Sequence, residues 1–166
     1  MKGFSGFPAE KTRNTPVPNQ FFSELLPQID DLDELKLTLY CFWRLALKSD
    51  QICHMRLREL EQDEALLSSF QQPDTSGLGK ALESACARGT LIRIKVEQAD
   101  GCEDYFFLNT HKGRAALESI SRGDWSPPDS AEAPISMTME LPNIFTLYEQ
   151  NIGALTPLIA DELRDA

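Results

Sequence analysis

The feature that most constrains the fold is a change of hydrophobic period at Gly89, where a helical pattern gives way directly to a strand pattern. Before it, residues 77–88 carry apolar side chains at helical spacing, namely Leu78, Ala81, Leu82 and Ala85. After it, Leu91, Arg93 and Lys95 alternate with Ile92, Ile94 and Val96, as a strand with two different faces requires. Residues 105–108 supply a return strand beyond a turn containing Asp100-Gly101. The sequence therefore predicts a short helix ended by Gly89 and followed at once by an antiparallel hairpin.

Further helical patterns flank this unit. One covers residues 32–49 after the acidic pair Asp30-Asp31, which are good N-cap residues. Another covers residues 55–70, and a last one, residues 110–122, starts at Thr110 and ends at Gly123. Helix, helix, helix, hairpin, helix is the order of a winged helix-turn-helix. The predicted fold class is therefore α+β, mostly helical, with a winged helix-turn-helix as its first domain.

The helix over residues 32–49 has two apolar edges, so it is predicted to be central and packed on two sides. We expect its buried stripe to contain Leu35, Leu39, Phe42, Trp43 and Ala46, with Leu37, Cys41 and Leu45 as a second edge. We expect solvent to meet Glu34, Lys36, Arg44 and Lys48. An acidic cluster in the next helix is interpreted as a solvated face, not a cation site; it contains Glu59, Glu61, Asp63 and Glu64.

Domain boundaries follow from proline content, charge and periodicity. Residues 1–20 are predicted to be an extended arm, 21–123 the winged-helix domain, and 124–141 an acidic, proline-containing linker. Residues 142–166 are predicted to be the opening helix of a truncated second, all-α domain. Residues 123–166 hold eight acidic residues and one basic residue, so seven of the chain's ten excess negative charges lie there.

Composition and motifs argue against several classes of protein. No run of 18 apolar residues and no signal-peptide pattern occur, so we expect no membrane span and a cytoplasmic location. The four cysteines have no C-x-x-C spacing, and Cys53-His54 is interpreted as structural. No nucleotide-binding, zinc-protease or nucleophile-elbow motif is present. We therefore expect no enzyme, no cofactor and no metal site.

On a winged helix, the third helix and the hairpin are the surfaces that meet DNA. The DNA-binding candidates are Lys80, Ser84, Arg88, Arg93 and Lys95. Acidic residues surround them and oppose phosphate binding, namely Asp74, Glu83, Glu97, Asp100, Glu103 and Asp104. We therefore expect weak DNA binding and interpret the domain as a protein–protein module. Most aromatic residues are expected in the core, although one ring of Phe106-Phe107 is expected to be exposed, and Phe4 and Phe7 in the arm are candidates for interaction.

Two segments resemble DnaD-like replication proteins. In residues 15–43 the resemblance is carried by Pro18-Asn19, Phe21-Phe22, Leu25-Leu26-Pro27, Ile29-Asp30-Asp31-Leu32 and Glu34-Leu35-Lys36. In the tail it is carried by Phe145, Tyr148, Glu149, Gln150, Asn151, Gly153, Leu155 and Pro157, which are similar to the opening of the second DnaD domain. Between them, Ala81-Leu82-Glu83 and Ala87-Arg88-Gly89-Thr90 lie where the recognition helix and the wing begin.

The resemblance implies a bacterial primosomal role in replication initiation and restart, with replication or helicase-loading proteins as partners. It implies a first domain that forms homo-oligomers and a second that carries most DNA binding, here with the motif residues Tyr148, Asn151 and Gly153. Self-association is expected through the arm and Phe21-Phe22, with Phe4 and Phe7. We expect a departure from the family in the second domain, which is predicted here to stop after one helix; if the natural protein ended at Ala166, DNA binding through that domain would be in doubt. The alternative is a winged-helix transcription regulator that binds duplex DNA through its third helix and wing.

Overall fold

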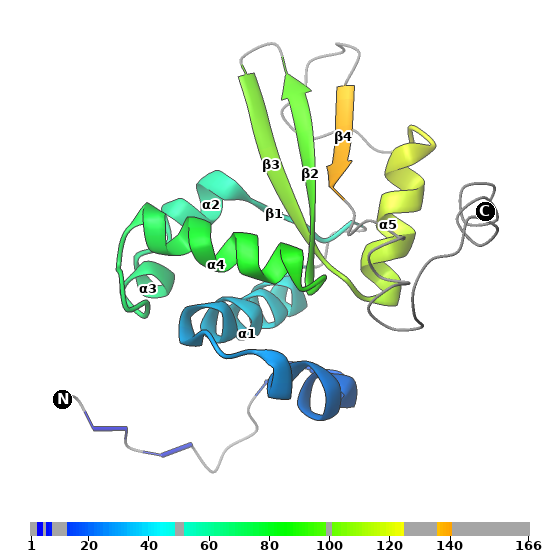
Figure 1. Ribbon diagram of the computed structural model, residues 1–166. Coiled ribbons are helices and arrows are strands. Elements are labelled where there is room, and N and C mark those ends of the chain that lie inside the picture. The colour runs from blue at the N-terminus through cyan, green and yellow to red at the C-terminus, as the bar shows by residue number, and fades with distance from the viewer. Residues whose placement is uncertain are drawn as a thin grey trace, which may run out of the picture.

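A computed structural model of the 166-residue chain describes residues 3–4, 6–7, 13–48, 52–98, 101–124 and 136–140. This part is mixed α+β, with helices packed around a small antiparallel sheet, as Figure 1 shows. The tail with its expected motif residues Tyr148, Asn151 and Gly153 lies outside the described residues. Within the described part, no helix has the length and apolar character needed to cross a bilayer.

The helices and strands follow one another in an order that places the hairpin directly after a helix. Two short turns, a π-helical one at Phe21–Leu25 and a 3₁₀ one at Leu26–Gln28, come first. The elements are then α1 (Leu32–Leu47), β1 (Met55–Arg56), α2 (Leu57–Glu61), α3 (Glu64–Leu67), α4 (Thr75–Ala87), β2 (Leu91–Gln98), β3 (Gly101–Leu108), α5 (His111–Ser121) and β4 (Ser136–Glu140). The strands lie in the order β1-β3-β2-β4, and every neighbouring pair is antiparallel.

A hydrophobic cluster covers each face of the sheet. On one face, Met55, Leu91, Phe106 and Leu108 pack with residues of α1, α2 and α4. On the other, five strand residues pack with α5, namely Ile92, Ile94, Val96, Tyr105 and Phe107. The predicted alternation along the hairpin is therefore confirmed. Both Phe106 and Phe107 are buried, so the expectation of one exposed ring is wrong, because α5 covers the second face.

The predicted helix ends are confirmed by local hydrogen bonds. Asp31 accepts hydrogen bonds from the backbone N–H groups of Asp33 and Glu34 at 2.7 and 3.0 Å. Thr110 caps α5 through Gly113 at 3.2 Å. Gly89 and Gly123 follow their helices with φ of 79° and 80°, the left-handed conformation that glycine adopts without strain.

The single helix expected over residues 55–70 is wrong. Met55 and Arg56 instead form β1, which pairs with Phe106 and Tyr105 of β3. The remainder divides into α2 and α3, because Asp63 accepts a hydrogen bond from the backbone of Leu66 and starts a new helix. Pairing with a strand that is distant in the sequence thus overrides a local helical pattern.

The expectation for α1 is confirmed for Leu37 and Cys41 of its second edge, which are buried, and wrong for its main stripe. The buried side of the helix contains Glu34, Leu37, Thr38 and Cys41. Leu39 and Trp43, expected in the core, are exposed, and Glu34, expected in solvent, is fully buried. The helix carries apolar residues on two opposite sides, so hydrophobicity alone does not select the side that packs.

β4 lies within the segment predicted to be a linker. It pairs with β2 over five residues and extends the sheet beyond the hairpin. Proline content and charge suggested no regular structure there, so the sequence reasoning missed this strand.

Two glycines of α4 provide a matched test of how closely this helix packs against the loop that precedes it. A Cβ on Gly77 would lie 2.2 Å from the backbone oxygen of Gln72, whereas a Cβ on Gly79 would meet nothing within 4 Å. We expect Gly77→Ala to lower the free energy of unfolding by about 1–3 kcal/mol through overpacking. Gly79→Ala is expected to raise it by about 0.5–1 kcal/mol, because alanine favours the helix. Urea unfolding followed by circular dichroism measures both, and equal effects would contradict the position of the loop before α4.

Candidate interaction surface

Arg88, one of the DNA-binding candidates, lies in an intramolecular ion pair. Its Nε donates to Oε1 of Glu34 at 2.7 Å and its Nη2 donates to Oε2 at 3.1 Å. Nη2 also lies 3.5 Å from Oδ1 of Asp30. The hydrogen bonds to Glu34 raise the pKa of Arg88, and Glu34 itself is completely buried. This arginine therefore holds α4 against the start of α1 through two parallel, charge-assisted bonds.

The remaining DNA candidates do not form one exposed basic surface. Arg93 and Lys95 are half-buried on the sheet face that also carries Phe106, and Arg93 lies 3.9 Å from the carboxylate of Asp104. Asp104 is also the Cα partner of Lys95 across the hairpin. Ser84 is half-buried, and Lys80 is exposed on α4 with a hydrogen bond to Gln72. Of the five candidates, only Lys80 is fully on the surface.

The outer face of α1 gathers several exposed apolar side chains on one helix. It consists of Leu32, Leu39, Trp43 and Leu47, whose side chains are 41–47% exposed. Successive spacings of seven, four and four residues place them on one side of the helix, opposite Leu37 and Cys41. Phe22 and Leu26, on the turns before α1, are exposed as well. Apolar side chains gathered on one helical face are typical of a protein–protein contact.

Polar groups border the outer face of α1 at its C-terminal end. The rings of Tyr40 and Trp43 meet edge to face at 5.6 Å, and the Arg44 guanidinium lies 6.0 Å from both ring centroids. A hollow of about 410 Å³ lies beside Trp43 and is lined by Arg13, Asn14, Thr15, Ala46, Leu47 and Lys48. An apolar centre with a cationic and aromatic border is common in protein interfaces.

The four phenylalanines expected to mediate self-association differ in their exposure to solvent. Phe21 is buried and packs edge to face on Phe42 at 6.0 Å, so it anchors the turn before α1 and is not available to a partner. Phe22 is 56% exposed. Phe4 and Phe7 are also exposed, and their rings meet at 5.0 Å.

Sequence reasoning missed Leu32, Leu39 and Leu47 as surface residues. The signal that could have found them was present, because a 16-residue helix with apolar residues on two opposite sides needs two partners. In the described part of the chain, α4 and the sheet cover the inner side, whereas the outer side is bordered by Arg13, Asn14 and Thr15 and stays 41–47% exposed.

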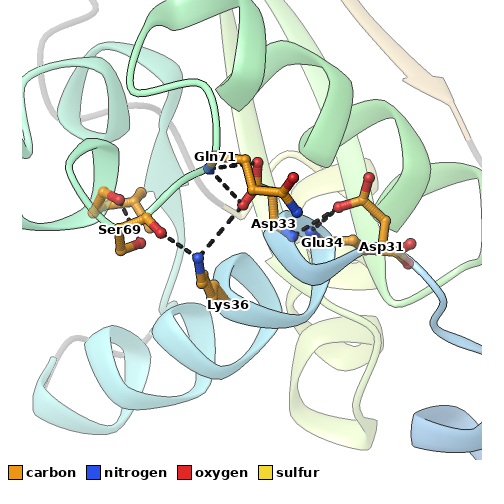
Figure 2. A network of polar contacts seen from close by, with 7 residues as sticks. Asp31, Asp33, Glu34, Lys36, Ser69 and Gln71 are labelled. Atoms are coloured by element: carbon orange, nitrogen blue, oxygen red, sulfur yellow. Dashed lines mark hydrogen bonds and ion pairs between the residues drawn. The ribbon is translucent and has the colours of Figure 1, made fainter.

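A polar network fixes the start of α1 to the loop before α4, as Figure 2 shows. Both carboxylate oxygens of Asp33 accept the backbone N–H of Gln71 at 3.0 Å. Lys36 lies 3.6 Å from Asp33 and donates to the backbone oxygen of Ser69. Together with the Glu34–Arg88 pair, these bonds hold α1 in one orientation, so its outer face is presented as a fixed surface.

The ionisable groups near α1 have structural roles. Tyr40 donates a hydrogen bond to Asp63, and this bond lowers the pKa of Asp63. Burial raises the pKa of the Cys41 thiol, and the neighbouring Cys86 adds to the effect. The four cysteines form no disulfide. Across the described ranges, no three His, Cys, Asp or Glu side chains are grouped so that they could hold a metal ion.

Comparison with known proteins gave no match to a family model, to a curated protein or to a solved structure.

We expect that removing one partner of the Glu34–Arg88 pair strongly lowers stability, whereas replacing both partners with apolar residues costs much less. Arg88→Met leaves the Glu34 carboxylate buried without its partner, which costs about 3–5 kcal/mol in comparable cases. Glu34→Leu combined with Arg88→Met removes both charges, and we expect it to recover most of that loss. Arg122→Met, which breaks the exposed pair with Asp124, is the matched control and should change stability by less than about 0.5 kcal/mol. Urea unfolding at pH 7 measures all three, and equal losses from Arg88→Met and the control would contradict this role.

The buried His54 is expected to make stability depend on pH. Burial, with repulsion from Lys48, lowers the pKa of His54, and its ring packs against Tyr105 and Phe107. The unfolded chain binds a proton near pH 6.5, whereas the folded chain binds it only at lower pH. Stability from neutral His54 is therefore present above about pH 6.5 and is lost as pH falls below it.

Unfolding free energies between pH 7.5 and 5.5 test this prediction. His54→Gln should flatten the pH dependence, whereas His111→Gln, at an exposed position on α5, should leave it unchanged. The same slope in both variants would show that His54 does not cause the dependence.

Proposed function

We propose that this domain is the self-associating module of a DnaD-like replication-initiation protein, and that it assembles through the outer face of α1. In this proposal the domain has the winged-helix fold, and DNA is bound mainly by the segment that resembles the second DnaD domain. Replication or helicase-loading proteins are the proposed partners of the assembled form. The observation that carries the proposal is the set of exposed apolar side chains along α1, namely Leu32, Leu39, Trp43 and Leu47.

The element order supports the winged-helix part of the proposal. A helix, a short strand, further helices and a hairpin follow one another, and the short strand pairs with the second strand of the hairpin. This order is common to replication modules and to transcription regulators. It therefore supports the winged-helix fold but does not distinguish the two functions. The exposed side chains and their charges are needed for that distinction.

The distribution of basic side chains favours a protein partner over DNA. Arg88 is held by Glu34, and Arg93 lies beside Asp104. DNA binding depends on several cations that neutralise phosphates together, because the release of counterions supplies most of the affinity. Lys80 alone offers an exposed cation among the candidates on α4 and the hairpin.

The ends of α1 carry opposite charges, which favours a symmetric contact between two copies. Asp31 lies at its start and Arg44 in its last turn, whereas Asp30 and Lys48 already pair with Arg88 and Glu59 within the chain. If two α1 helices pack antiparallel about a twofold axis, the acidic start of each lies near the basic end of the other. Such a contact is self-complementary and closes as a dimer.

Light scattering across concentration, with a single charge placed on the outer face of α1, tests the proposal. We expect the unmodified chain to form dimers or larger species. Leu39→Asp should abolish the contact through this face because it puts an unpaired charge into an apolar interface. Since Leu39 is 41% exposed, its replacement should leave the fold intact by circular dichroism.

The matched control is Ala115→Asp, which places the same charge at an exposed position of α5 and should leave self-association unchanged. A parallel titration of duplex and single-stranded DNA, at about 50 and 200 mM salt, follows any phosphate-driven binding. A monomer that binds one duplex sequence tightly, with affinity lost in Lys80→Ala, would overturn the proposal in favour of a transcription regulator.

A further inference from the structure

The outer edge of the hairpin is closed by a strand from the segment that follows α5. β4 runs antiparallel to β2, and the register pairs Arg93 with Glu140, Lys95 with Thr138 and Glu97 with Ser136. Figure 1 shows β4 at the outside of the sheet, beside β2. Without β4, β2 would present a row of backbone N–H and C=O groups to solvent, which is a template for another strand.

β4 is attached to the domain through one neighbour. Among the described elements, β2 is the only one that β4 contacts extensively. β3, by contrast, lies between β1 and β2 and contributes side chains to both hydrophobic clusters. A strand with a single neighbour opens at a lower free energy than a central strand. The β2–β4 pairing, at an edge of the sheet, is therefore expected to open more easily than the central β2–β3 pairing.

We propose that the β2 edge is a strand-addition site, and that residues 136–140 of a second copy of this chain can replace the chain's own β4. The incoming strand is identical, so it re-forms every pair in the register, including Arg93 opposite Glu140. Eleven residues, 125–135, separate the last described residue after α5 from β4. A segment of this length spans up to about 40 Å when extended, which is enough to cross to a neighbouring molecule. Exchange of an identical element is a low-cost route to oligomers.

This strand exchange uses a surface different from the outer face of α1 and does not require it. The contact through α1 relies on apolar side chains, whereas the β2 edge relies on backbone hydrogen bonds. A twofold contact through α1 closes as a dimer, and exchange at the β2 edge would link such dimers into larger assemblies. The chain would then have two assembly contacts with different chemistry.

A disulfide trap distinguishes exchange between copies from pairing within one copy. One chain carries Lys95→Cys, and a second chain with a size tag carries Thr138→Cys. Cα partners in antiparallel strands lie about 4.5–5.5 Å apart, within the range of a disulfide. Both chains also carry Cys102→Ser, because Cys102 is exposed. After the two are mixed, incubated and mildly oxidised, a covalent heterodimer above the level of random encounters between thiols requires that β4 of one copy pairs with β2 of the other.

We expect several-fold more heterodimer from this pair than from a mismatched pair of Lys95→Cys and Glu140→Cys, which are out of register. A single chain with both Lys95→Cys and Thr138→Cys should form the bond internally, which verifies the register. No heterodimer above the mismatched level, while this internal bond forms, would overturn the exchange. Failure of the internal bond would overturn the pairing itself and the exchange with it.

The trap is repeated with Leu39→Asp in both chains. We expect the heterodimer to form in this background too, because the β2 edge is separate from α1. Light scattering of the same samples measures self-association through α1, whereas the disulfide trap measures strand exchange. Each proposal can therefore fail independently of the other.

Discussion

The buried ion pair between Glu34 and Arg88 is the interaction on which the arrangement of α1, α4 and the hairpin depends. Arg88 is the C-cap residue of α4, and β2 begins three residues later. Glu34 lies in the first turn of α1, so the pair joins the start of one helix to the end of the other. The corner after Arg88 is then fixed by backbone hydrogen bonds, from Thr90 to Ala85 at 2.9 Å and from Asn109 to Thr90 at 2.9 Å. The direction in which the hairpin leaves α4 is thus coupled to the rotation of α1 about its own axis.

That coupling accounts for which of the two apolar sides of α1 is exposed. A helix with apolar residues on two sides can pack either side inward, and a fully buried carboxylate with a matching guanidinium selects one of them. Once Glu34 faces Arg88, Leu37 and Cys41 enter the core and Leu39 and Trp43 are turned outward. The same interaction removes Arg88 from any DNA-binding surface. One buried pair therefore both exposes the proposed protein contact and removes a cation from the expected nucleic-acid contact.

The sequence predicted the features that depend on contacts within a few residues. It did not predict those that depend on contacts between distant segments. Asp31, Thr110, Gly89 and Gly123 mark helix ends through bonds and backbone angles within a few residues, so their roles followed from local rules. The hairpin followed from its period of two. The partner of Glu34 lies 54 residues away, and nothing local distinguishes Arg88 from a surface arginine. β1 is missed for the same reason, because two residues become a strand only through pairing with β3.

The acidic segment after α5 affects how the hairpin can be used. Residues 123–166 carry seven of the ten excess negative charges, and β4 brings part of this segment against β2. The Cα of Glu140 lies opposite the Cα of Arg93. The carboxylate of Asp104 lies 3.9 Å from the guanidinium of Arg93. The carboxylate of Asp104 beside Arg93 opposes phosphate binding at this position of the hairpin. An identical strand from a second copy would restore the same register against β2, so the proposed exchange keeps Glu140 and Arg93 as Cα partners.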